Sequence, residues 1–277
     1  MNDYELEYAG RDLVVSGVSC FNLALSLDCG QAFRWQAQSD DSFTGAAYGR
    51  LLNISQNGDS LTLKNTTKED FENIWKHYFS LDEDYEEICK MLCKDAYITP
   101  AVERFYGIRI LNQEPWEALF SFVISQQNNI KRIKLIIDRL CTRYGVCLQD
   151  GFYSFPDCET LSHLSESDFA ELGAGYRAKY LERLAKSAAA GEIDFEKIKK
   201  MKLDDARREL MKIYGVGVKV ADCSLLFGFG FFDAFPVDVW MKRVMQHYPN
   251  GLPECFNGVR GIAQQYLFHY QRTDSLI

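Results

Sequence analysis

The stretch LMKIYGVGVKVADC at residues 210–223 carries the most information about the fold of this 277-residue chain. Apolar spacing before it predicts a helix from Asp204 to Tyr214, two glycines predict a tight turn, and a second helix follows at once. Glycines keep side chains out of the turn, so its N–H groups and the second helix's N-terminus can approach a phosphate closely. The unit, about residues 204–228, is either an ordinary helix–turn–helix packing motif or a phosphate-binding site.

Two side chains near this turn have the chemistry of a catalytic pair. Lys219 falls in the first turn of the second helix, where its charge opposes the helix dipole. Pro-Val-Asp238 follows nineteen residues later and precedes an apolar-periodic helix, so Asp238 is predicted to cap that helix. A carboxylate held there stays ionised and can stabilise a cation that develops at a sugar carbon.

The composition excludes several classes of protein. With 47% hydrophobic and 25% charged residues, the chain is globular and not disordered or collagen-like. It lacks an apolar run of the roughly 18 residues that a membrane span needs, and its N-terminus carries acids where a signal peptide would be basic. Nine cysteines without a C-x-x-C pair predict reduced thiols and offer no four-cysteine cluster for an iron–sulfur centre.

The net charge of −8 argues mildly against a nucleic-acid partner, but the charge is unevenly distributed. Residues 1–100 carry a net charge of −9, whereas residues 128–219 carry +3. A phosphate-binding face is therefore predicted on the second stretch only.

The chain is predicted to be an α+β protein: an antiparallel sheet domain with flanking helices at 1–100, then a helical domain at 101–277. Alternating leucines over Leu23–Leu27 predict a strand, and Asn57-Gly58 between two apolar runs predicts a hairpin.

Helix starts and stops are predicted farther along the chain. Pro115 fits a first helical position, and Asn128 or Asn129 caps the next helix, which ends before Gly145. Ser165 begins another short helix.

Taken together, the glycine turn, Lys219 and Pro-Val-Asp238 resemble the helix-hairpin-helix DNA glycosylase superfamily. Three further segments resemble, more narrowly, the eukaryotic-type 8-oxoguanine DNA glycosylases. GQAFRW at 30–35 is similar to that family's G-Q-S-F-R-W, SQQNN at 125–129 to its asparagine-rich loop, and GYRAKY at 175–180 to its G-Y-R-A-R-Y. The resemblance covers nearly the whole chain.

The resemblance implies a base-excision-repair enzyme with glycosylase and lyase activities. Lys219 would attack C1′ of the damaged nucleotide, expel the base and form a Schiff base, and β-elimination would follow. Asp238 would support the sugar cation. Attack needs a neutral amine, and bringing a lysine pKa from about 10.4 to near 7 takes roughly 4–5 kcal/mol.

The resemblance also implies how the flipped base is recognised. The Gly30 carbonyl would accept the N7–H that distinguishes 8-oxoguanine from guanine, and Gln264 would bind the Watson–Crick edge. Cys223 and Phe268 would stack on the two faces. Lys219 and Cys223, like Gln264 and Phe268, are four residues apart and share a helix face. Without the resemblance, core packing is the favoured interpretation of Cys223 and Phe268.

DNA contacts are implied at a further set of residues. Tyr176 would enter the gap left by the base, Arg132 and Arg177 would contact the orphaned cytosine, and the hairpin glycines would meet phosphates. The chain departs from the family at Gln127, where the family has asparagine, and at Trp240, where it has histidine. The DNA-binding residues are therefore predicted to be Gln127, Asn128, Arg132, Tyr176, Arg177, Gly215, Gly217 and Trp240.

The expected partner is duplex DNA with 8-oxoguanine opposite cytosine, bound by a monomer away from membranes. The enzyme would need no cofactor and no iron–sulfur cluster, although the hairpin has room for a cation on its backbone carbonyls. It would act in the cytoplasm or nucleoid of a prokaryote, or in the nucleus of a eukaryote, and would not be secreted.

Two alternatives remain at this point. One is a related glycosylase for a formamidopyrimidine, an oxidised pyrimidine or an alkylpurine. The iron–sulfur branches need cysteines that this chain lacks, and the alkyl-base branches typically lack the hairpin lysine. The other is a non-catalytic hairpin module that binds DNA backbone, which would have no need for Lys219 and Asp238 in these places.

Overall fold

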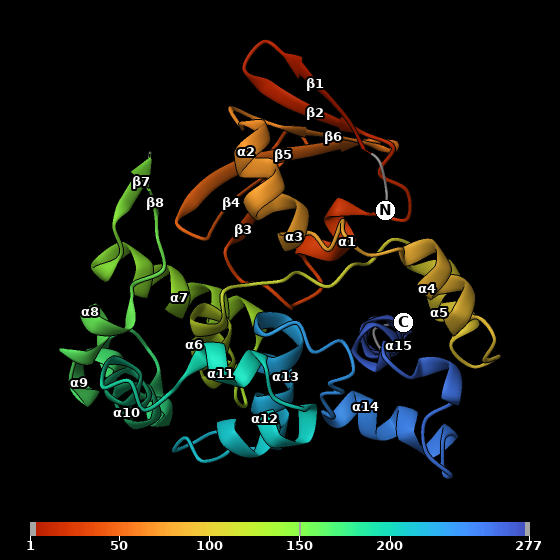
Figure 1. Ribbon diagram of the computed structural model, residues 1–277. Helices are drawn as coiled ribbons and strands as arrows, with labels where there is room; N and C mark the ends of the chain where they lie inside the picture. The colour runs from red at the N-terminus through yellow and green to blue at the C-terminus, as the bar shows by residue number, and fades with distance from the viewer. Residues whose placement is uncertain (1–3, 150, 275–277) are drawn as a thin grey trace.

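A six-stranded antiparallel sheet forms the N-terminal part of the computed structural model, which describes residues 4–149 and 151–274 (Figure 1). The strand order is β1-β2-β6-β5-β4-β3, and each strand pairs antiparallel with its neighbours. The strands are β1 (Glu5–Ala9), β2 (Asp12–Ser16), β3 (Trp35–Ala37), β4 (Phe43–Ala47), β5 (Arg50–Asn57) and β6 (Ser60–Leu63). The predicted hairpin is confirmed, because Asn57 pairs with Ser60 across the turn.

The segment Leu23–Leu27 is a helix, α1, and the predicted strand is wrong. Asn22 caps it by accepting a hydrogen bond from the Leu25 N–H at 2.9 Å. Leu23 and Leu27 are both buried, as residues four apart on one helix face should be. Over five residues, leucines at every second position fit either a strand face or this helical pair, so the capping residue decides.

Short helical segments cover one side of the sheet: α2 (Lys68–Asp70), the π-helical turn η1 (Phe71–Trp75) and α3 (Lys76–Tyr78). The next helices, α4 (Tyr85–Leu92) and α5 (Thr99–Arg104), contribute their buried side chains to the helical core instead. Trp75, Tyr78 and Phe79 pack with Trp35 in one aromatic cluster, with ring centroids 5.9–6.4 Å from that of Trp35. The predicted domain boundary at residue 100 falls within α5 and stays a prediction.

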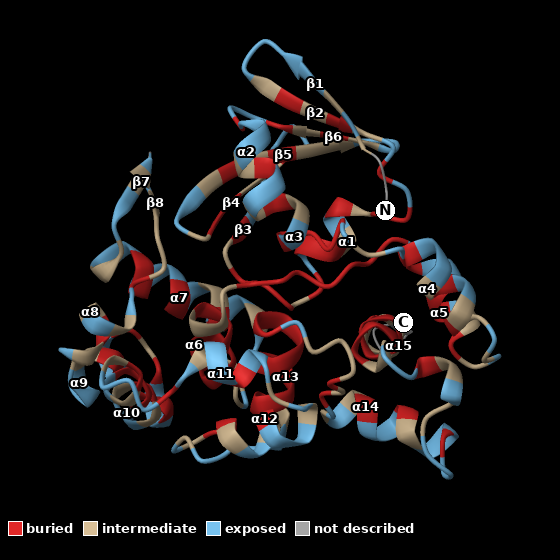
Figure 2. Cartoon of the chain, viewed as in Figure 1, coloured by how far each residue is buried: buried red, intermediate tan, exposed pale blue. Residues whose placement is uncertain are grey.

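An extended, buried connection at residues 107–113 runs between the sheet and the helices (Figure 2). Ile108 and Ile110 belong to the helical core, whereas Leu111 belongs to the core beneath the sheet. Arg109, only 1% exposed, donates to the carbonyls of Ser19, Cys20 and Ser80 at 2.6–2.9 Å. A buried guanidinium thus satisfies backbone groups of two loops where the two cores meet.

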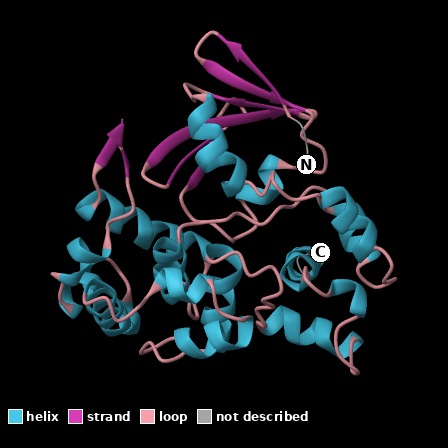
Figure 3. Cartoon of the chain, viewed as in Figure 1, coloured by secondary structure: helices cyan, strands magenta, loops and turns pink. Residues whose placement is uncertain are grey.

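The remaining chain is mainly helical, which confirms the α+β class (Figure 3). A small sheet of β7 (Cys147–Gln149) and β8 (Phe152–Tyr153), absent from the sequence prediction, interrupts it. The helices are α6 (Pro115–Ile124), α7 (Ile130–Tyr144), α8 (Cys158–Ser162), α9 (Glu166–Glu171), η2 (Gly175–Arg177), α10 (Ala178–Ala189), α11 (Phe195–Lys199), α12 (Leu203–Leu210), α13 (Val218–Gly228), α14 (Val239–Val244), η3 (Met245–His247), η4 (Glu254–Phe256) and α15 (Arg260–Asp274).

Most of the predicted helix ends are confirmed. Pro115 begins α6, Asn129 caps α7, Gly145 follows its end, and Ser165 forms a capping box at the start of α9. The helix predicted from Asp204 to Tyr214 is shorter: α12 begins at Leu203 and ends at Leu210.

Asp204 therefore does not cap α12. Its carboxylate lies in the first turn and accepts a hydrogen bond from Arg207 at 2.6 Å. Residues 211–216 form successive turns toward the hairpin, with N–H groups of Ile213 and Val216 bonded three residues back.

Candidate active site

A small cavity of about 70 Å³ lies where both parts of the chain meet. Its walls come from the end of α1, from α6, α13 and α15, and from the loop before α14. The lining residues are Cys29, Gly30, Phe122, Lys219, Cys223, Phe227, Pro236, Asp238, Gln264, Gln265 and Phe268. All six residues predicted for catalysis and base binding are therefore brought together, from segments far apart in the sequence.

Lys219 reaches this cavity because the glycine turn ends just before it. Gly217 is the N-cap of α13, which makes Lys219 the second residue of the helix. Its ammonium nitrogen lies 5.8 Å from the centroid of the Phe122 ring, which provides an apolar wall.

Lys219 and Asp238 both act electrostatically on one neighbour, the Cys223 thiol. Burial raises the pKa of Cys223 above its ordinary value, and the charge of Lys219 offsets part of that rise. Asp238 raises the same pKa further. Lys219 and Asp238 also line the same cavity, as the catalytic hypothesis requires.

Asp238 is held in place by the helix that it caps. Its Oδ1 accepts hydrogen bonds from the backbone N–H groups of Trp240 and Met241, at 3.0 and 2.9 Å. The predicted capping role is thus confirmed, and the same carboxylate lines the cavity.

Gly30 enters the cavity in a conformation that favours glycine, with a φ of +94°. A Cβ atom at this position would lie 3.0 Å from Cδ1 of Ile130. The next residue, Gln31, is 1% exposed and donates to the carbonyls of Ser26 and Arg109 at 2.9 and 2.7 Å. Its Oε1 accepts from the Leu111 N–H at 2.9 Å, so the buried connection fixes the loop that carries Gly30.

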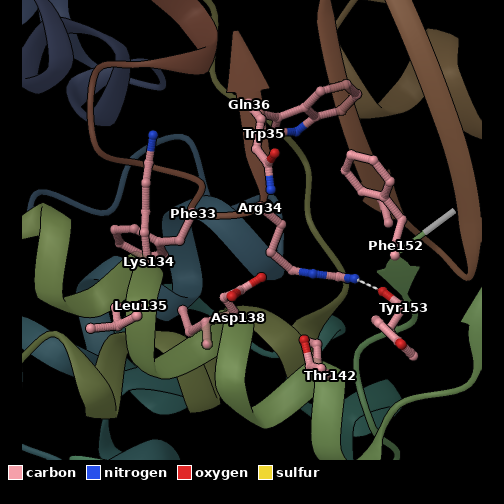
Figure 4. Close-up of a pocket in the computed structure, with 14 residues that line it drawn as sticks. Phe33, Arg34, Trp35, Gln36, Lys134, Leu135, Asp138, Thr142, Phe152 and Tyr153 are labelled. Carbon is pink, nitrogen blue, oxygen red and sulfur yellow. Dashed lines mark hydrogen bonds between the residues drawn. The ribbon is translucent and has the colours of Figure 1, made fainter. Parts of the chain in front are cut away.

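The other end of the 30–35 segment is fixed by Arg34. Its Nη1 lies 3.1 Å from Oε2 of Glu117 on α6, and its Nη2 donates to the Tyr153 carbonyl on β8. Figure 4 shows this guanidinium crossing a separate cavity of about 270 Å³ between β3, α7 and the β7–β8 hairpin. Burial raises the pKa of Glu117, and the charge of Arg34 offsets part of that rise. The ion pair between these two buried side chains tethers the segment to α6.

The sequence reasoning missed five lining residues: Cys29, Phe122, Phe227, Pro236 and Gln265. Phe122 belongs to α6, in which every residue from Glu117 to Ile124 is buried, so nothing in its spacing distinguishes it from core. Gln265 is next to Gln264, and only the family resemblance favoured Gln264 over its neighbour. Both amides are buried and line the cavity.

Two of the residues predicted to meet the opposite strand lie together on the surface. Tyr176 is 47% exposed, and its hydroxyl donates to the Gln126 carbonyl at 3.3 Å. Arg132 is exposed on α7 and donates to the Gly173 carbonyl at 3.1 Å, beside the turn that carries Tyr176.

Arg177, in contrast, is 3% exposed and faces inward. Its guanidinium donates to the carbonyls of Gln126, Gln127 and Ala174. The structure therefore presents Arg177 as the residue that shapes the 125–129 loop and not as a surface contact. Gln127, exposed at the tip of this loop, has a φ of +46°.

The asparagine side chains of the same loop stay within it. Asn128 donates to the Ile124 carbonyl at 3.1 Å, and its Oδ1 accepts from the Asn129 N–H. Trp240 lies on α14 beyond the cavity, half-buried, with the Arg243 guanidinium 4.8 Å from its ring.

The two hairpin glycines differ in their surroundings. Gly215 has a φ of +87°, and a Cβ there would lie within 2.5 Å of the Tyr180 ring. Gly217 has an extended φ of −95° and no heavy atom within 4 Å of a built Cβ, so its face of the turn is open. The Gly215 carbonyl accepts from the Gln126 amide at 3.1 Å, which joins the hairpin to the 125–129 loop.

Among residues 4–149 and 151–274, no group of three or more histidine, cysteine or acidic side chains is arranged to hold a metal ion. Within the same ranges, no helix is long and apolar enough to cross a membrane.

Comparison with known proteins gives matches over both parts of the chain. Residues 13–119 match the family described as 8-oxoguanine DNA glycosylase, N-terminal domain. Residues 120–251 match the HhH-GPD superfamily base excision DNA repair protein.

Curated relatives include the N-glycosylase/DNA lyase of Saccharomyces cerevisiae, 41% identical over 153 residues, which are 50% of this chain and 41% of that protein. The N-glycosylase/DNA lyase of Arabidopsis thaliana is 30% identical over 243 residues, 82% of this chain and 66% of that protein. The chain thus spans less than two thirds of the length of either relative.

A solved structure of similar length is the Clostridium acetobutylicum 8-oxoguanine glycosylase/lyase in complex with dsDNA containing cytosine opposite to 8-oxoG. It superposes with a TM-score of 0.94 at 36% identity and covers 99% of this chain and 100% of that one.

Proposed function

Because the chain belongs to the 8-oxoguanine DNA glycosylase family, we propose that it removes 8-oxoguanine from duplex DNA and then cleaves the strand at the abasic site. The observation that carries this proposal is the single cavity lined by Lys219, Asp238 and the predicted base-binding residues. A cavity within the protein can act only on a base that has left the stack, so the substrate nucleotide is flipped out of the duplex.

The chemistry proceeds through the amine of Lys219. Its nitrogen forms a bond to C1′ as the bond from C1′ to the base breaks, and the base leaves with the electron pair and takes up a proton. Loss of the amine proton and opening of the sugar give a Schiff base. Removal of a proton from C2′ then expels the 3′ phosphate by cleavage of the C3′–O bond.

Asp238 stabilises the positive charge that develops on the sugar as the base departs. Its carboxylate is fixed by two backbone N–H groups, so little reorganisation is needed when that charge appears. The Phe122 ring beside Lys219 excludes water from one side of the amine.

Recognition of the damaged base relies on the Gly30 carbonyl. Guanine has a lone pair at N7 whereas 8-oxoguanine has an N–H, so a fixed carbonyl attracts the damaged base and repels the normal one. Gln264 binds the Watson–Crick edge, and Cys223 and Phe268 contact the two faces.

Tyr176 fills the gap that the flipped base leaves in the duplex, and Arg132 contacts the cytosine of the opposite strand. Arg177 supports both residues indirectly, because it orders the 125–129 loop that carries Gln127 and Asn128. Gly215, Gly217 and Trp240 contact the phosphates, and the backbone carbonyls of the hairpin are the groups that would hold a cation. The enzyme acts as a monomer without a resident cofactor, in the nucleoid of a prokaryote or in the nucleus of a eukaryote.

Borohydride trapping tests this proposal. The native chain, incubated with an 8-oxoguanine:cytosine duplex and borohydride, is expected to give a covalent protein–DNA adduct, because reduction fixes the Schiff base. Lys219→Gln should give none. Lys242→Gln, which removes an exposed lysine from neighbouring α14, is the matched control and should give the native yield.

Absence of an adduct with the native chain would remove the lyase proposal. An adduct that persists in Lys219→Gln would assign the nucleophile to another residue.

A further inference from the structure

A one-directional chain of hydrogen bonds passes along the back of the cavity. The Cys29 thiol lies 3.6 Å from Oε1 of Gln265, and the Gln265 amide nitrogen donates to Oε1 of Gln264 at 2.8 Å. The Gln264 amide nitrogen in turn donates to the Pro236 carbonyl at 3.2 Å. Both glutamines are buried, 4% and 5% exposed, so these groups have few alternative partners.

This chain fixes which end of the Gln264 side chain is the donor. The Pro236 carbonyl can only accept, so the amide nitrogen must face it, and Gln265 presents N–H to the other end. A reversed Gln264 amide would place two donors together and two acceptors together, each pair buried and unsatisfied. Each end still keeps one hydrogen-bonding position, a second N–H and a second lone pair, for a base in the cavity.

The Cys29 thiol fixes the direction of Gln265 in the same way. In this series of hydrogen bonds, the thiol is the one donor that is not an amide. Its proton is shared between Oε1 of Gln265 and the Ser26 carbonyl, whose oxygen lies 3.4 Å from the sulfur. Burial raises the pKa of Cys29 to about 11, so the thiol stays protonated and remains a donor at neutral pH.

A fixed amide direction matters because the Gly30 carbonyl does not identify the base. An N7–H is present in 8-oxoadenine as well as in 8-oxoguanine. The two differ at the Watson–Crick edge, where guanine places an acceptor, O6, beside a donor, N1–H, and adenine places a donor beside an acceptor. When N7–H is bound by the Gly30 carbonyl, a Gln264 amide of fixed direction can form hydrogen bonds with only one of these two edges. Against the other edge it would place donor against donor and acceptor against acceptor.

We propose that Gln265, supported by Cys29, is a positioning residue that holds the Gln264 amide in the direction that accepts 8-oxoguanine and rejects 8-oxoadenine. This inference rests on the proposed glycosylase function and adds a determinant of base selectivity that acts through Gln264.

The test is the ratio of single-turnover excision rates on two duplexes, one with 8-oxoguanine and one with 8-oxoadenine, each opposite cytosine. Gln265→Leu removes the donor to Gln264 at similar volume and should lower the ratio about tenfold, the value of one lost hydrogen bond of typical strength. Cys29→Ala should shift the ratio in the same direction, and Cys29→Ser, which retains a donor, should restore it.

The matched control is Gln271→Leu, the same substitution on the same helix. Gln271 donates to the Tyr97 hydroxyl and does not line the cavity, so its loss should leave the ratio at the native value.

An unchanged ratio in Gln265→Leu, or equal losses of rate on both duplexes, would overturn the positioning role. No excision of 8-oxoguanine by the native chain would instead overturn the proposed function itself, so the two failures are distinguishable.

Discussion

Asp238 shows how one side chain serves both the backbone and the cavity. Its Oδ1 satisfies two N–H groups at the start of α14, and those bonds aim the carboxylate at the cavity. A structural capping role and a catalytic role are therefore not alternatives at this residue, since the cap provides the rigidity that electrostatic stabilisation needs.

The two roles of Asp238 can be separated by substitution. Asp238→Ser keeps an oxygen that accepts from the helix N–H groups but removes the charge. Its free energy of unfolding should stay within about 0.5 kcal/mol of native, while the excision rate falls on the order of 10²-fold or more. Asp238→Ala should lose the rate and also about 1 kcal/mol of stability. Urea unfolding and single-turnover excision measure the two effects.

A serine variant that excises at the native rate would contradict the electrostatic role of Asp238. An Asp238→Ala variant with the native free energy of unfolding would show that the Asp238 cap does not stabilise the protein.

At the residue scale, the sequence predicted side chains related by regular helical spacing. Lys219 and Cys223 share a face of α13, and Gln264 and Phe268 share one of α15, as their separation of four residues requires. It could not predict Gln265, because adjacent helical residues normally point about 100° apart. Gln265 reaches the cavity through its long side chain and its bond to Gln264.

At the scale of elements, the turn between α12 and α13 contains two glycines, Gly215 and Gly217, that are required for different reasons. Gly215 needs its positive φ, and the Tyr180 ring occupies the space where a side chain would begin. Gly217 is extended and open, so it has no packing reason to lack a side chain. The proposed close approach of a DNA backbone would account for the bare surface at Gly217.

The substitutions Gly215→Ala and Gly217→Ala are therefore expected to have different effects on stability and on DNA binding. Gly215→Ala should lower the free energy of unfolding by about 1–3 kcal/mol, because it introduces both backbone strain and a clash with Tyr180. Gly217→Ala should leave stability near native and weaken duplex DNA binding. Urea unfolding and DNA binding at fixed salt separate the two.

Equal losses of stability in both variants would contradict this distinction between the glycines. Native DNA affinity in Gly217→Ala would remove the phosphate contact.

Predicted elements were accurate where a strong local signal marked their ends. The Asn57-Gly58 hairpin and the Asn129 cap lie where predicted. The failures came from short segments: Leu23–Leu27 has too few residues to distinguish two periods, and the acidic start of α12 fits a cap or a first turn equally well. The β7–β8 hairpin has strands of only three and two residues, too short for a pattern.

At the scale of the whole molecule, the 107–113 connection joins the two cores. Arg109 is surrounded by carbonyls from the loops at Ser19–Cys20 and Ser80–Glu83, and its plane lies 4.4 Å from the centroid of the Tyr85 ring. Gln31 binds the same connection and leads to Gly30. No periodic pattern in the sequence predicted this arrangement, because it depends on contacts between loops that are distant in the sequence.

Loss of Arg109 should therefore destabilise the whole protein. Arg109→Met retains much of the volume but leaves several buried carbonyls without donors, and should lower the free energy of unfolding by about 3–5 kcal/mol. Arg50→Met removes an arginine from an exposed ion pair with Asp70 and should change it by less than about 1 kcal/mol.

Urea denaturation of both variants measures the difference. Equal midpoints for Arg109→Met and Arg50→Met would show that the buried guanidinium does not hold the two cores together.

The cavity draws its walls from separate stretches of chain. The Gly30 loop is anchored by the sheet side, whereas Lys219 and Asp238 belong to the helical side. On the proposed function, substitutions in the Gly30 loop would therefore alter the contact with N7 of the base while leaving Lys219, Asp238 and the other base-binding residues in place.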